Sequence, residues 1–462
     1  MLEKLLNYLE NKKILILGFG KEGESSYLFL RKHFPEKKLE IVDKNMNLLT
    51  DKPYLLEDIN VEVVLGEDYF RDIDYFDIVL KTPGISLKDF DISKFENKIT
   101  SQLELLLEFV PCYTIGVTGT KGKSTTSSLI YQMIKDQGKD VMLLGNIGEP
   151  IFNDIDDMKK DTILVLELSS HALEFVKKSP NIAILLDIYE EHLDHYSSME
   201  KYIEAKFNVA KFQSKNDIFI YNASNRYMQE FNFNYKKSDY AIIEEDSELS
   251  KTLNLKSDNY VLINEDRIYF NKTKLFDSKL NMQLKGKHNE NNVLFVLTVA
   301  KILNLNMEKA KNTIENFKNL EHRMEFVAEI NDVKYYNDSI ATIPEATINA
   351  VDALKNVNTL LVGGKDRGVE LDSLYEYLKK SNIENIICLP KTGEYVYNSL
   401  KDTNKKCYLV KDMPEAVKLA KEVTKPNTIC LLSPAASSYG YFKNFEERGK
   451  IYKECVLSTQ NS

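Results

Sequence analysis

GVTGTKGKST, at residues 116–125, is the stretch that decides the fold of the chain around it. It follows an apolar run that reads as a strand over 113–118, and it leads into a helix expected over 123–137. Glycines in such a turn let backbone N–H groups converge on phosphate oxygens, while Lys123 supplies an ammonium and Ser124 a hydroxyl for magnesium. The stretch therefore predicts a phosphate-binding loop between a strand and a helix.

One position departs from the usual loop. Val117 stands where the spacing GxxxxGK[ST] has its first glycine, so a plain glycine turn before a helix is the alternative interpretation. The combination of strand, GKS and helix favours the phosphate loop.

The composition is that of a folded protein with small-molecule ligands. The 462 residues, 43% hydrophobic and 28% charged, are enough for two to three cores. A net charge of −9 argues against a nucleic-acid partner. Scattered cysteines without CxxC spacing are expected to be buried free thiols. Because neither a secretion signal nor an apolar run of about eighteen residues is found, we expect a cytoplasmic protein that does not enter a membrane.

Apolar runs alternate with amphipathic stretches along most of the chain, a pattern typical of α/β folds with mainly parallel sheets. The expected strands are residues 13–18, 39–43, 77–82, 113–118, 162–168, 181–187, 358–364, 383–389, 406–410 and 427–433. The expected helices are residues 22–33, 101–109, 123–137, 198–212 and 289–303. Between about 217 and 285 the alternation instead indicates antiparallel hairpins at a sheet edge.

GFGKEG (18–23) follows a strand, precedes a helix and is trailed by Asp43, twenty residues after its last glycine. This is the pattern of a dinucleotide-binding turn, so a dehydrogenase is one interpretation and a site for a uridine diphosphate group is another. Thr82 and Gly84, in TPGI (82–85), offer a hydroxyl and backbone amides at the same sheet edge, or form a plain turn.

Three further positions follow strands of the phosphate-loop block. Glu167, in ELSS, is either a magnesium ligand or a capping acid. His192, in EEHLDHY, is either a metal or substrate ligand or a structural histidine. For Lys206, on the following helix, the pattern alone indicates a solvated lysine on an amphipathic face.

Polar side chains near the end of that block are also candidate ligands. Asn289 and Asn292 suit a nucleotide base or a helix cap, Arg323 suits phosphate, and Asp338 suits a ribose hydroxyl or a metal. Each is otherwise an ordinary polar surface residue. GGKDRG (363–368) and SPAASSYGYFKNFEERG (433–449) follow strands, where open α/β sheets carry ligand contacts.

These motifs together resemble the Mur ligases along nearly the whole chain. The loop is similar to the family's GTxGK[ST]T form, and ELSS, EEH with a downstream lysine, HNxxN, HR and NDSxAT follow in family order. GKST, ELSSH and the ending SPAASSYGYFKNFEERG look most like the members that add D-glutamate. The resemblance implies an α/β fold of three domains: Rossmann-like over 1–100, P-loop ATPase-like over 101–319, and Rossmann-like over 320–462.

The resemblance also implies an activity and its ligands. It implies a ligase that uses ATP and two Mg²⁺ ions to add D-glutamate to UDP-N-acetylmuramoyl-L-alanine through an acyl phosphate, in peptidoglycan precursor synthesis. The third domain is expected to close on ATP, and the protein is expected to be a monomer.

By resemblance, the catalytic residues are Lys123, His192, Lys206 and Arg323, and the metal ligands are Ser124, Glu167, His192 and Lys206, the last as a carbamate. The implied ATP contacts are Gly119, Thr120, Lys121, Gly122, Lys123, Ser124, Thr125, Asn289, Asn292, Arg323 and Asp338. The implied substrate contacts are Gly20, Asp43, Thr82 and Gly84 for the UDP end, Asn146 at the reacting centre, and Thr342, Arg367, Ser438 and Phe445 for D-glutamate.

The chain departs from the family pattern in places. Lys121 stands where asparagine is common, Ile340 replaces the lysine of NDSKAT, and either Lys365 or Arg367 is the basic partner of the D-glutamate carboxylate. A folylpolyglutamate synthase would leave GFGKEG and SPAASS unexplained, and a dehydrogenase would leave GTKGKST unexplained. A non-catalytic nucleotide-binding protein would have no need for His192, Lys206 and Arg323 together.

Overall fold

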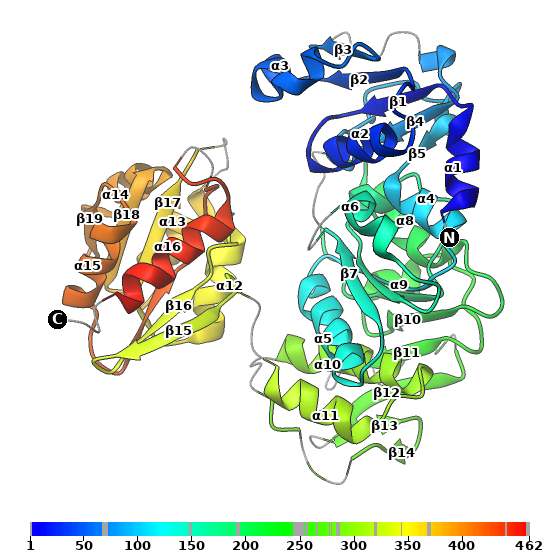
Figure 1. Ribbon diagram of the computed structural model, residues 1–462. Helices are drawn as coiled ribbons and strands as arrows, with labels where there is room; N and C mark the ends of the chain where they lie inside the picture. The colour runs from blue at the N-terminus through cyan, green and yellow to red at the C-terminus, as the bar shows by residue number, and fades with distance from the viewer. Residues whose placement is uncertain are drawn as a thin grey trace. The chain divides into compact units, whose positions relative to one another are not determined.

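The computed structural model folds around three sheets flanked by helices (Figure 1). It forms two compact units, one of residues 1–282 and 287–316 and the other of residues 283–286 and 317–462. The structure describes residues 2–66, 73–146, 150–190, 195–243, 255, 257–264, 267–276, 278, 280–282, 287–317, 321–342, 344–366, 371–438 and 441–458.

The N-terminal sheet has five parallel strands in the order β3-β2-β1-β4-β5. Successive residues of β1 enter different cores, Ile14 and Ile16 on one face and Leu15 and Leu17 on the other. A strand buried on both faces reads as a continuous apolar run, which is why this one was predictable. The strand order reverses between β1 and β4, and open α/β sheets generally bind ligands beyond the carboxyl ends of the strands at such a point. The elements are α1 Glu3–Glu10, β1 Ile14–Leu17, α2 Lys21–His33, β2 Leu39–Asp43, α3 Leu48–Asp51, η1 Pro53–Leu56, β3 Val61–Leu65, η2 Ile73–Tyr75, β4 Ile78–Lys81, η3 Glu96–Lys98 and β5 Ile99–Thr100.

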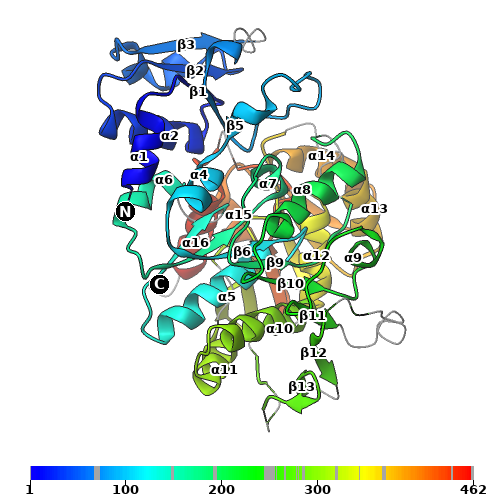
Figure 2. The ribbon, with the colours of Figure 1, turned by 90° about the vertical axis from the view of Figure 1, so that its right-hand side faces the viewer.

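The second sheet of this unit has nine strands in the order β14-β13-β12-β11-β10-β9-β6-β8-β7. Figure 2 shows α7 beside α8, and α10 beside α11. The helices are α4 Gln102–Phe109, α5 Lys123–Asp136, α6 Ile151–Asp154, η4 Ile155–Asp157, α7 Ser170–Leu173, α8 Met199–Lys211, α9 Arg226–Glu230, α10 Lys287–Ile302 and α11 Met307–Asn316. The strands are β6 Tyr113–Thr118, β7 Val141–Gly145, β8 Ile163–Glu167, β9 Ile182–Leu185, β10 Ile218–Asn222, β11 Tyr240–Ile243, β12 Asn259–Asn264, β13 Arg267–Phe270 and β14 Thr273–Lys274.

The prediction of antiparallel hairpins over 217–285 is wrong for the first part of that range. β10 pairs in parallel with β9 and β11, and β11 pairs in parallel with β12. The connection from β10 to β11 contains α9, and such a crossover is what a parallel pair requires. Only β12, β13 and β14 pair as antiparallel hairpins among the described strands here.

The two sheets of this unit are joined through Gln102 at the start of α4. Its side chain donates to the backbone oxygen of Glu22 and to Ser26 Oγ, both at 2.9 Å, and accepts from the Phe152 backbone N–H at 3.2 Å. With 2% of Gln102 exposed, these buried polar groups satisfy one another. Helix α2 of the first sheet is thereby fixed against α6 of the second.

The second unit has six strands in the order β15-β16-β20-β17-β18-β19, parallel except for β15. Leu360 and Val362 of β17 enter one core and Leu361 enters the other, so helices cover both faces. The α/β fold class expected from the sequence is confirmed in all three sheets. The elements are β15 Glu325–Ile330, β16 Val333–Asn337, α12 Pro344–Leu354, β17 Val357–Gly364, α13 Asp372–Lys380, β18 Asn385–Lys391, α14 Thr392–Leu400, β19 Lys406–Leu409, α15 Met413–Val423, β20 Thr428–Leu432 and α16 Phe445–Leu457.

Two composition-based expectations bear on the described residues. All the cysteines are free thiols, as expected; Cys112, Cys388 and Cys430 are buried, whereas Cys407 and Cys455 are only half-buried. In the part of the chain that the structure describes, no helix has the length and apolar character needed to cross a bilayer.

Candidate functional site

The loop between β6 and α5 has the geometry of a phosphate cradle. Gly119 has φ 152° and Gly122 has φ 85°, both in the region that favours glycine. A Cβ at Gly119 would lie 2.7 Å from Leu186 Cβ, and one at Gly122 would lie 2.6 Å from Asn292 Oδ1. The Thr120 N–H donates to the Asp187 backbone oxygen at 2.7 Å, which ties the loop to the end of the β9 segment. Because α5 begins at Lys123, its N-terminus points positive charge into the loop.

Two lysines from different helices reach this loop. Lys123 Nζ donates to the backbone oxygens of Gly119 and Thr120 at 3.0 and 2.9 Å, and Lys206 Nζ donates to that of Gly119 at 2.8 Å. Lys206 is 2% exposed, and its ammonium lies 4.7 Å from the centre of the Tyr202 ring. The interpretation of Lys206 as a solvated surface lysine is therefore wrong. The Lys206 side chain of α8 points into the protein, so that Lys123 and Lys206 both contact the loop between β6 and α5.

Glu167 ends β8 beside this loop, opposite Val117 in the strand register. It is 2% exposed, and its Oε1 accepts from Asn146 Nδ2 at 3.0 Å. Among the described residues, Oε2 has no hydrogen-bond partner. Ser169 caps α7, accepting from the Ala172 N–H, so Glu167 is not the capping residue. A buried carboxylate with an unshared oxygen fits a divalent cation such as Mg²⁺.

The structure also describes the other residues predicted in and around the phosphate loop, with one exception. Ser124 is 8% exposed at the start of α5, and Thr125 follows it. Lys121 lies 5.9 Å from the centre of the Tyr189 ring. The exception is His192, which lies outside the described residues. Within the described parts of the chain, no three His, Cys, Asp or Glu side chains gather as a metal-binding group.

The asparagine pair of α10 also borders the loop. Asn292 Nδ2 donates to Asn289 Oδ1 at 3.3 Å, and both residues are less than a tenth exposed. Since both lie inside α10, Lys287–Ile302, neither caps that helix, and Asn292 is the residue that leaves no space for a side chain at Gly122.

The GFGKEG turn is braced by Asp43. The Phe19 N–H donates to Asp43 Oδ2 at 2.6 Å, and the Asn45 N–H donates to Oδ1 at 2.7 Å. A Cβ at Gly23 would lie 2.1 Å from the Gly18 backbone oxygen, whereas one at Gly20 would meet no atom within 4 Å. Gly20 therefore faces open space at the N-terminus of α2.

The TPGI turn lies against the same strand end. Thr82 donates twice to the Leu17 backbone oxygen, from its N–H at 2.9 Å and from Oγ1 at 3.1 Å. A Cβ at Gly84 would meet no atom within 4 Å. The Thr82 hydroxyl thus has a structural partner, and Gly84 is the open position of the turn.

Sequence reasoning missed a buried ion pair behind this turn. Lys81, 5% exposed at the end of β4, lies 3.6 Å from Glu174 Oε2, which also contacts His195 Nε2 at 3.2 Å. Burial lowers the pKa of Lys81, and the Glu174 carboxylate opposes that shift. Its only sequence signal was a charged residue closing an otherwise apolar strand.

In the second unit, Asp338 is enclosed at the end of the β16 segment. It is 4% exposed, and its carboxylate accepts from Ser433 Oγ at 2.7 Å and from the Met324 N–H at 3.2 Å. Burial raises the pKa of Asp338 to about 7, against the opposing effect of these two hydrogen bonds and the Arg323 charge. Arg323 itself is half-buried.

A fully buried arginine links three motifs of this unit and was also missed. Arg448 donates to Ser339 Oγ at 3.0 Å, to the Ser339 backbone oxygen at 2.7 Å and to the Ala436 backbone oxygen at 3.0 Å. A Cβ at Gly364 would lie 3.1 Å from its Nη1. Burial lowers the pKa of Arg448 to about 9. The NDSIAT, GGK and SPAASS loops therefore meet around one guanidinium, which lies inside the FEERG motif.

The residues expected to hold D-glutamate differ in how deeply they are buried. Ser438 is 3% exposed, Phe445 is half-buried at the start of α16, and Thr342 is exposed. The Lys365 N–H donates to the Ser437 backbone oxygen at 2.8 Å, so GGK and SPAASS run side by side. Arg367 lies outside the described residues, and the choice between Lys365 and Arg367 stays open.

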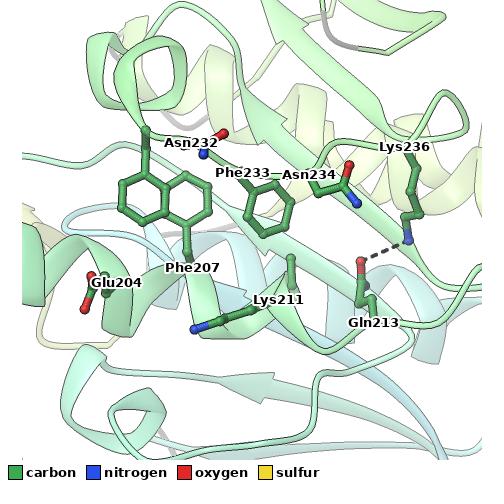
Figure 3. A pocket seen from close by; sticks show the side chains of 10 residues that line it. Glu204, Phe207, Lys211, Gln213, Asn232, Phe233, Asn234 and Lys236 are labelled. Atoms are coloured by element: carbon green, nitrogen blue, oxygen red, sulfur yellow. Dashed lines mark hydrogen bonds between the residues drawn. The ribbon is translucent and has the colours of Figure 1, made fainter.

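A cavity of about 390 Å³ lies away from these motifs (Figure 3). Its lining combines aromatic rings from α8 and the segment after α9 with lysine and amide side chains, and Lys236 Nζ donates to Gln213 Oε1 at 3.3 Å. None of the residues expected in the functional site lines it.

Comparison with known proteins matches the chain over most of its length. Residues 117–300 match the Mur ligase middle domain, and residues 322–436 match the Mur ligase glutamate ligase domain. UDP-N-acetylmuramoylalanine–D-glutamate ligase of Clostridium botulinum (strain Okra / Type B1) is 32% identical over 470 residues, 98% of each chain. The protein of the same name from Acetivibrio thermocellus is 32% identical over 464 residues, 98% of this chain and 97% of its own.

Solved structures are similar in fold. UDP-N-acetylmuramate-alanine ligase from Thermotoga maritima has a TM-score of 0.57 at 18% identity, covering 97% of this chain and 100% of its own. A pseudomurein peptide ligase type C from Methanothermus fervidus has a TM-score of 0.55 at 17% identity, with the same coverage of 97% and 100%.

Proposed function

The chain belongs to the Mur ligase family, and from that premise we propose that it joins D-glutamate to UDP-N-acetylmuramoyl-L-alanine at the expense of ATP, in peptidoglycan precursor synthesis. The observation that carries the proposal is the phosphate loop on which Lys123 and Lys206 converge, with the unshared oxygen of Glu167 on the neighbouring strand. That combination suits the transfer of a phosphoryl group from a bound nucleotide.

The reaction needs ATP because a carboxylate does not acylate an amine in water. Transfer of the γ-phosphoryl group to the carboxylate of the muramoyl-alanine substrate gives an acyl phosphate and ADP. Lys123 and Arg323 would stabilise negative charge on the group in transfer. The D-glutamate amine then attacks the acyl carbon, loses a proton, and expels inorganic phosphate from the tetrahedral intermediate.

Two Mg²⁺ ions are part of the proposal. Ser124 and Glu167 would hold the first, and His192 and Lys206 would serve the second. Bound magnesium would neutralise phosphate charge and orient the phosphoryl oxygens. For Glu167, the support is its buried unshared oxygen.

Lys206 is proposed to serve as a carbamate. Its neutral amine would add to carbon dioxide and release a proton, which gives an anion with two oxygens for magnesium. Two features support this: the side chain is buried, and it shares the Gly119 oxygen with Lys123.

The other contacts are assigned by position. Gly20, Asp43, Thr82 and Gly84 would hold the UDP end in domain 1–100, with Asp43 acting through the turn that it braces. Asn289, Asn292 and Asp338 would contact ATP, and Asn146 would contact the reacting centre. D-Glutamate would be held by Thr342, Arg367, Ser438 and Phe445 as the third domain closes. We further propose a cytoplasmic monomer.

One assay tests the proposed function directly. Phosphate release is measured with ATP, Mg²⁺, UDP-N-acetylmuramoyl-L-alanine and a panel of amino acids. The expected result is turnover that depends on both the UDP substrate and D-glutamate. If turnover occurs with a different amino acid and not with D-glutamate, that amino acid replaces D-glutamate in the proposal. If no amino acid of the panel supports turnover, the proposal is wrong.

A further inference from the structure

Lys81 is buried directly before the turn proposed to hold the UDP end. Its side chain is 3% exposed, and Nζ lies 3.3 Å from the Thr82 backbone oxygen and 3.6 Å from Glu174 Oε2. The Ile85 N–H donates to the same Thr82 oxygen at 3.3 Å, which closes the turn. One ammonium therefore contacts both the turn of the N-terminal sheet and a carboxylate that follows α7 in the central part of the unit.

Glu174 connects this lysine to the phosphoryl-transfer side. Its Oε2 contacts His195 Nε2 at 3.2 Å. The backbone oxygens of Leu173 and Glu174 accept from Asn208 Nδ2 at 3.0 and 3.3 Å. Asn208 lies two residues after Lys206 on α8, so the helix that carries Lys206 is bonded to the segment that carries Glu174.

One further hydrogen bond and one electrostatic interaction involve the residues around Lys81 and Glu174. Ser86, just after the turn, donates from Oγ to the His195 backbone oxygen at 3.0 Å. Glu22, in the GFGKEG motif, has a pKa raised by burial to about 7, and the Lys81 charge opposes that shift. The TPGI turn and the residue after it thus contact both Lys81 and the segment that carries His195.

We propose that Lys81 and Glu174 are positioning residues that fix the Thr82–Gly84 turn at a set distance from Lys206 and Glu167. The inference rests on the proposed function and adds residues to it that touch neither substrate nor metal. The carboxylate of the substrate has to meet the γ-phosphoryl group while its UDP end is held elsewhere, and a misplacement of about 1 Å can cost about a hundredfold in rate. A buried ion pair is a weak source of stability, because desolvation offsets its attraction, but it fixes geometry.

The test compares single and double neutral variants. Lys81→Met and Glu174→Gln should each raise KM for UDP-N-acetylmuramoyl-L-alanine and lower kcat, both by about tenfold, and leave KM for ATP within about twofold. Each single variant removes one side of the ion pair between the buried Lys81 and the half-buried Glu174 and is expected to lower Tm. The double variant Lys81→Met/Glu174→Gln removes both charges, so its Tm should recover.

The double variant separates positioning from stability. With a positioning role, its kcat and KM stay impaired although its Tm has recovered. If kcat and KM return to wild-type values together with Tm, or if either single variant that still folds has wild-type kinetics, the inference is overturned. Glu174→Gln is measured alone as well, so that a fold lost in one variant does not remove the test.

Lys32→Met is the matched control. Lys32 of α2 pairs with Asp156 of η4 at 2.6 Å, so it also joins the two sheets of this unit, but its side chain is 64% exposed. Exposed pairs contribute little, so its kinetics should match the wild type. An equal loss in this control would also overturn the inference. Failure of the proposed function gives a different result, because the wild-type protein would then show no turnover with the two substrates.

Discussion

The ammonium groups of Lys123 and Lys206 both donate to the Gly119 backbone oxygen, at 3.0 and 2.8 Å. The two lysines lie on different helices, α5 and α8, and are far apart in the sequence. An arrangement that holds two cations at one loop favours an anion there, and two predictions follow from the different roles proposed for them.

Lys123→Ala should lower turnover by about a thousandfold, because it removes a charge that stabilises the transferring phosphoryl group. Phosphate release measures the rate, and circular dichroism checks the fold. Lys135→Ala, at the exposed end of the same helix, is the control and should keep the wild-type rate. A Lys123→Ala enzyme with more than about a tenth of the wild-type rate would contradict the loop assignment.

Lys206→Ala should be nearly inactive, and Lys206→Arg should be inactive as well, because a guanidinium keeps the charge but cannot become a carbamate. Formate or acetate should restore part of the rate to the alanine variant by filling the vacated space with a carboxylate. Lys211→Ala, further along α8 and exposed, should behave as wild type. Full activity of Lys206→Arg would rule out the carbamate.

Gly20→Ala and Gly23→Ala should separate binding from stability. At Gly23 the new Cβ would lie 2.1 Å from a backbone oxygen, so the free energy of unfolding should fall by about 1–3 kcal/mol or more. At Gly20 the space is open, so stability should hold while calorimetry shows weaker binding of UDP. Saturable binding of NAD by the wild type at micromolar concentrations would refute the UDP assignment.

D-Glutamate should be accepted and L-glutamate rejected. Thr342, Arg367, Ser438 and Phe445 are proposed to fix both carboxylates, which leaves the amine of one enantiomer aimed at the acyl phosphate. Initial rates with each enantiomer at equal concentration measure the discrimination. Equal rates would show that these positions do not form a stereospecific site.

Asp338 should make the free energy of unfolding depend on pH. Its pKa is raised by burial from 3.8 to about 7, so the folded chain keeps a proton that the unfolded chain loses near pH 4. This contribution is complete below the unfolded pKa and is lost as pH rises through about 7, at up to about 1.4 kcal/mol per pH unit. Asp338→Asn has no such proton, so denaturant unfolding at several pH values should show a smaller decline with pH for the variant. The same decline in both proteins would contradict the raised pKa.

The sequence predicted those parts of the molecule where local pattern and chemistry agree. The strand before the phosphate loop is apolar, is followed by glycines with positive φ, and leads into a helix at Lys123, and the structure has each of these. Strand 39–43 was predicted to the residue, because its apolar residues are buried and exposed lysines, Lys38 and Lys44, flank it.

The rest depended on tertiary packing that a one-dimensional pattern does not contain. Strands β3 and β7 were missed; β3 is interrupted by a glutamate, and both strands are only partly buried. Lys206 and Asn208 are buried polar residues on α8, and helical periodicity assigns such positions to the solvent. No role was predicted for Arg448 from the sequence, because two of its three acceptors belong to Ser339, more than a hundred residues away.

The lack of space beside Gly122 has a consequence for the choice of nucleotide. Asn292 of α10 fills that position at the edge of the phosphate loop, so the helix proposed to face the nucleoside and the loop proposed to hold its phosphates are packed together within one unit. The distance between helix α10 and the phosphate loop is therefore fixed. A nucleotide with one phosphate more or fewer would place its terminal phosphate at a different distance from Lys123, while the distance between α10 and the loop would not change. We therefore expect the first unit by itself to select the nucleotide by its number of phosphates.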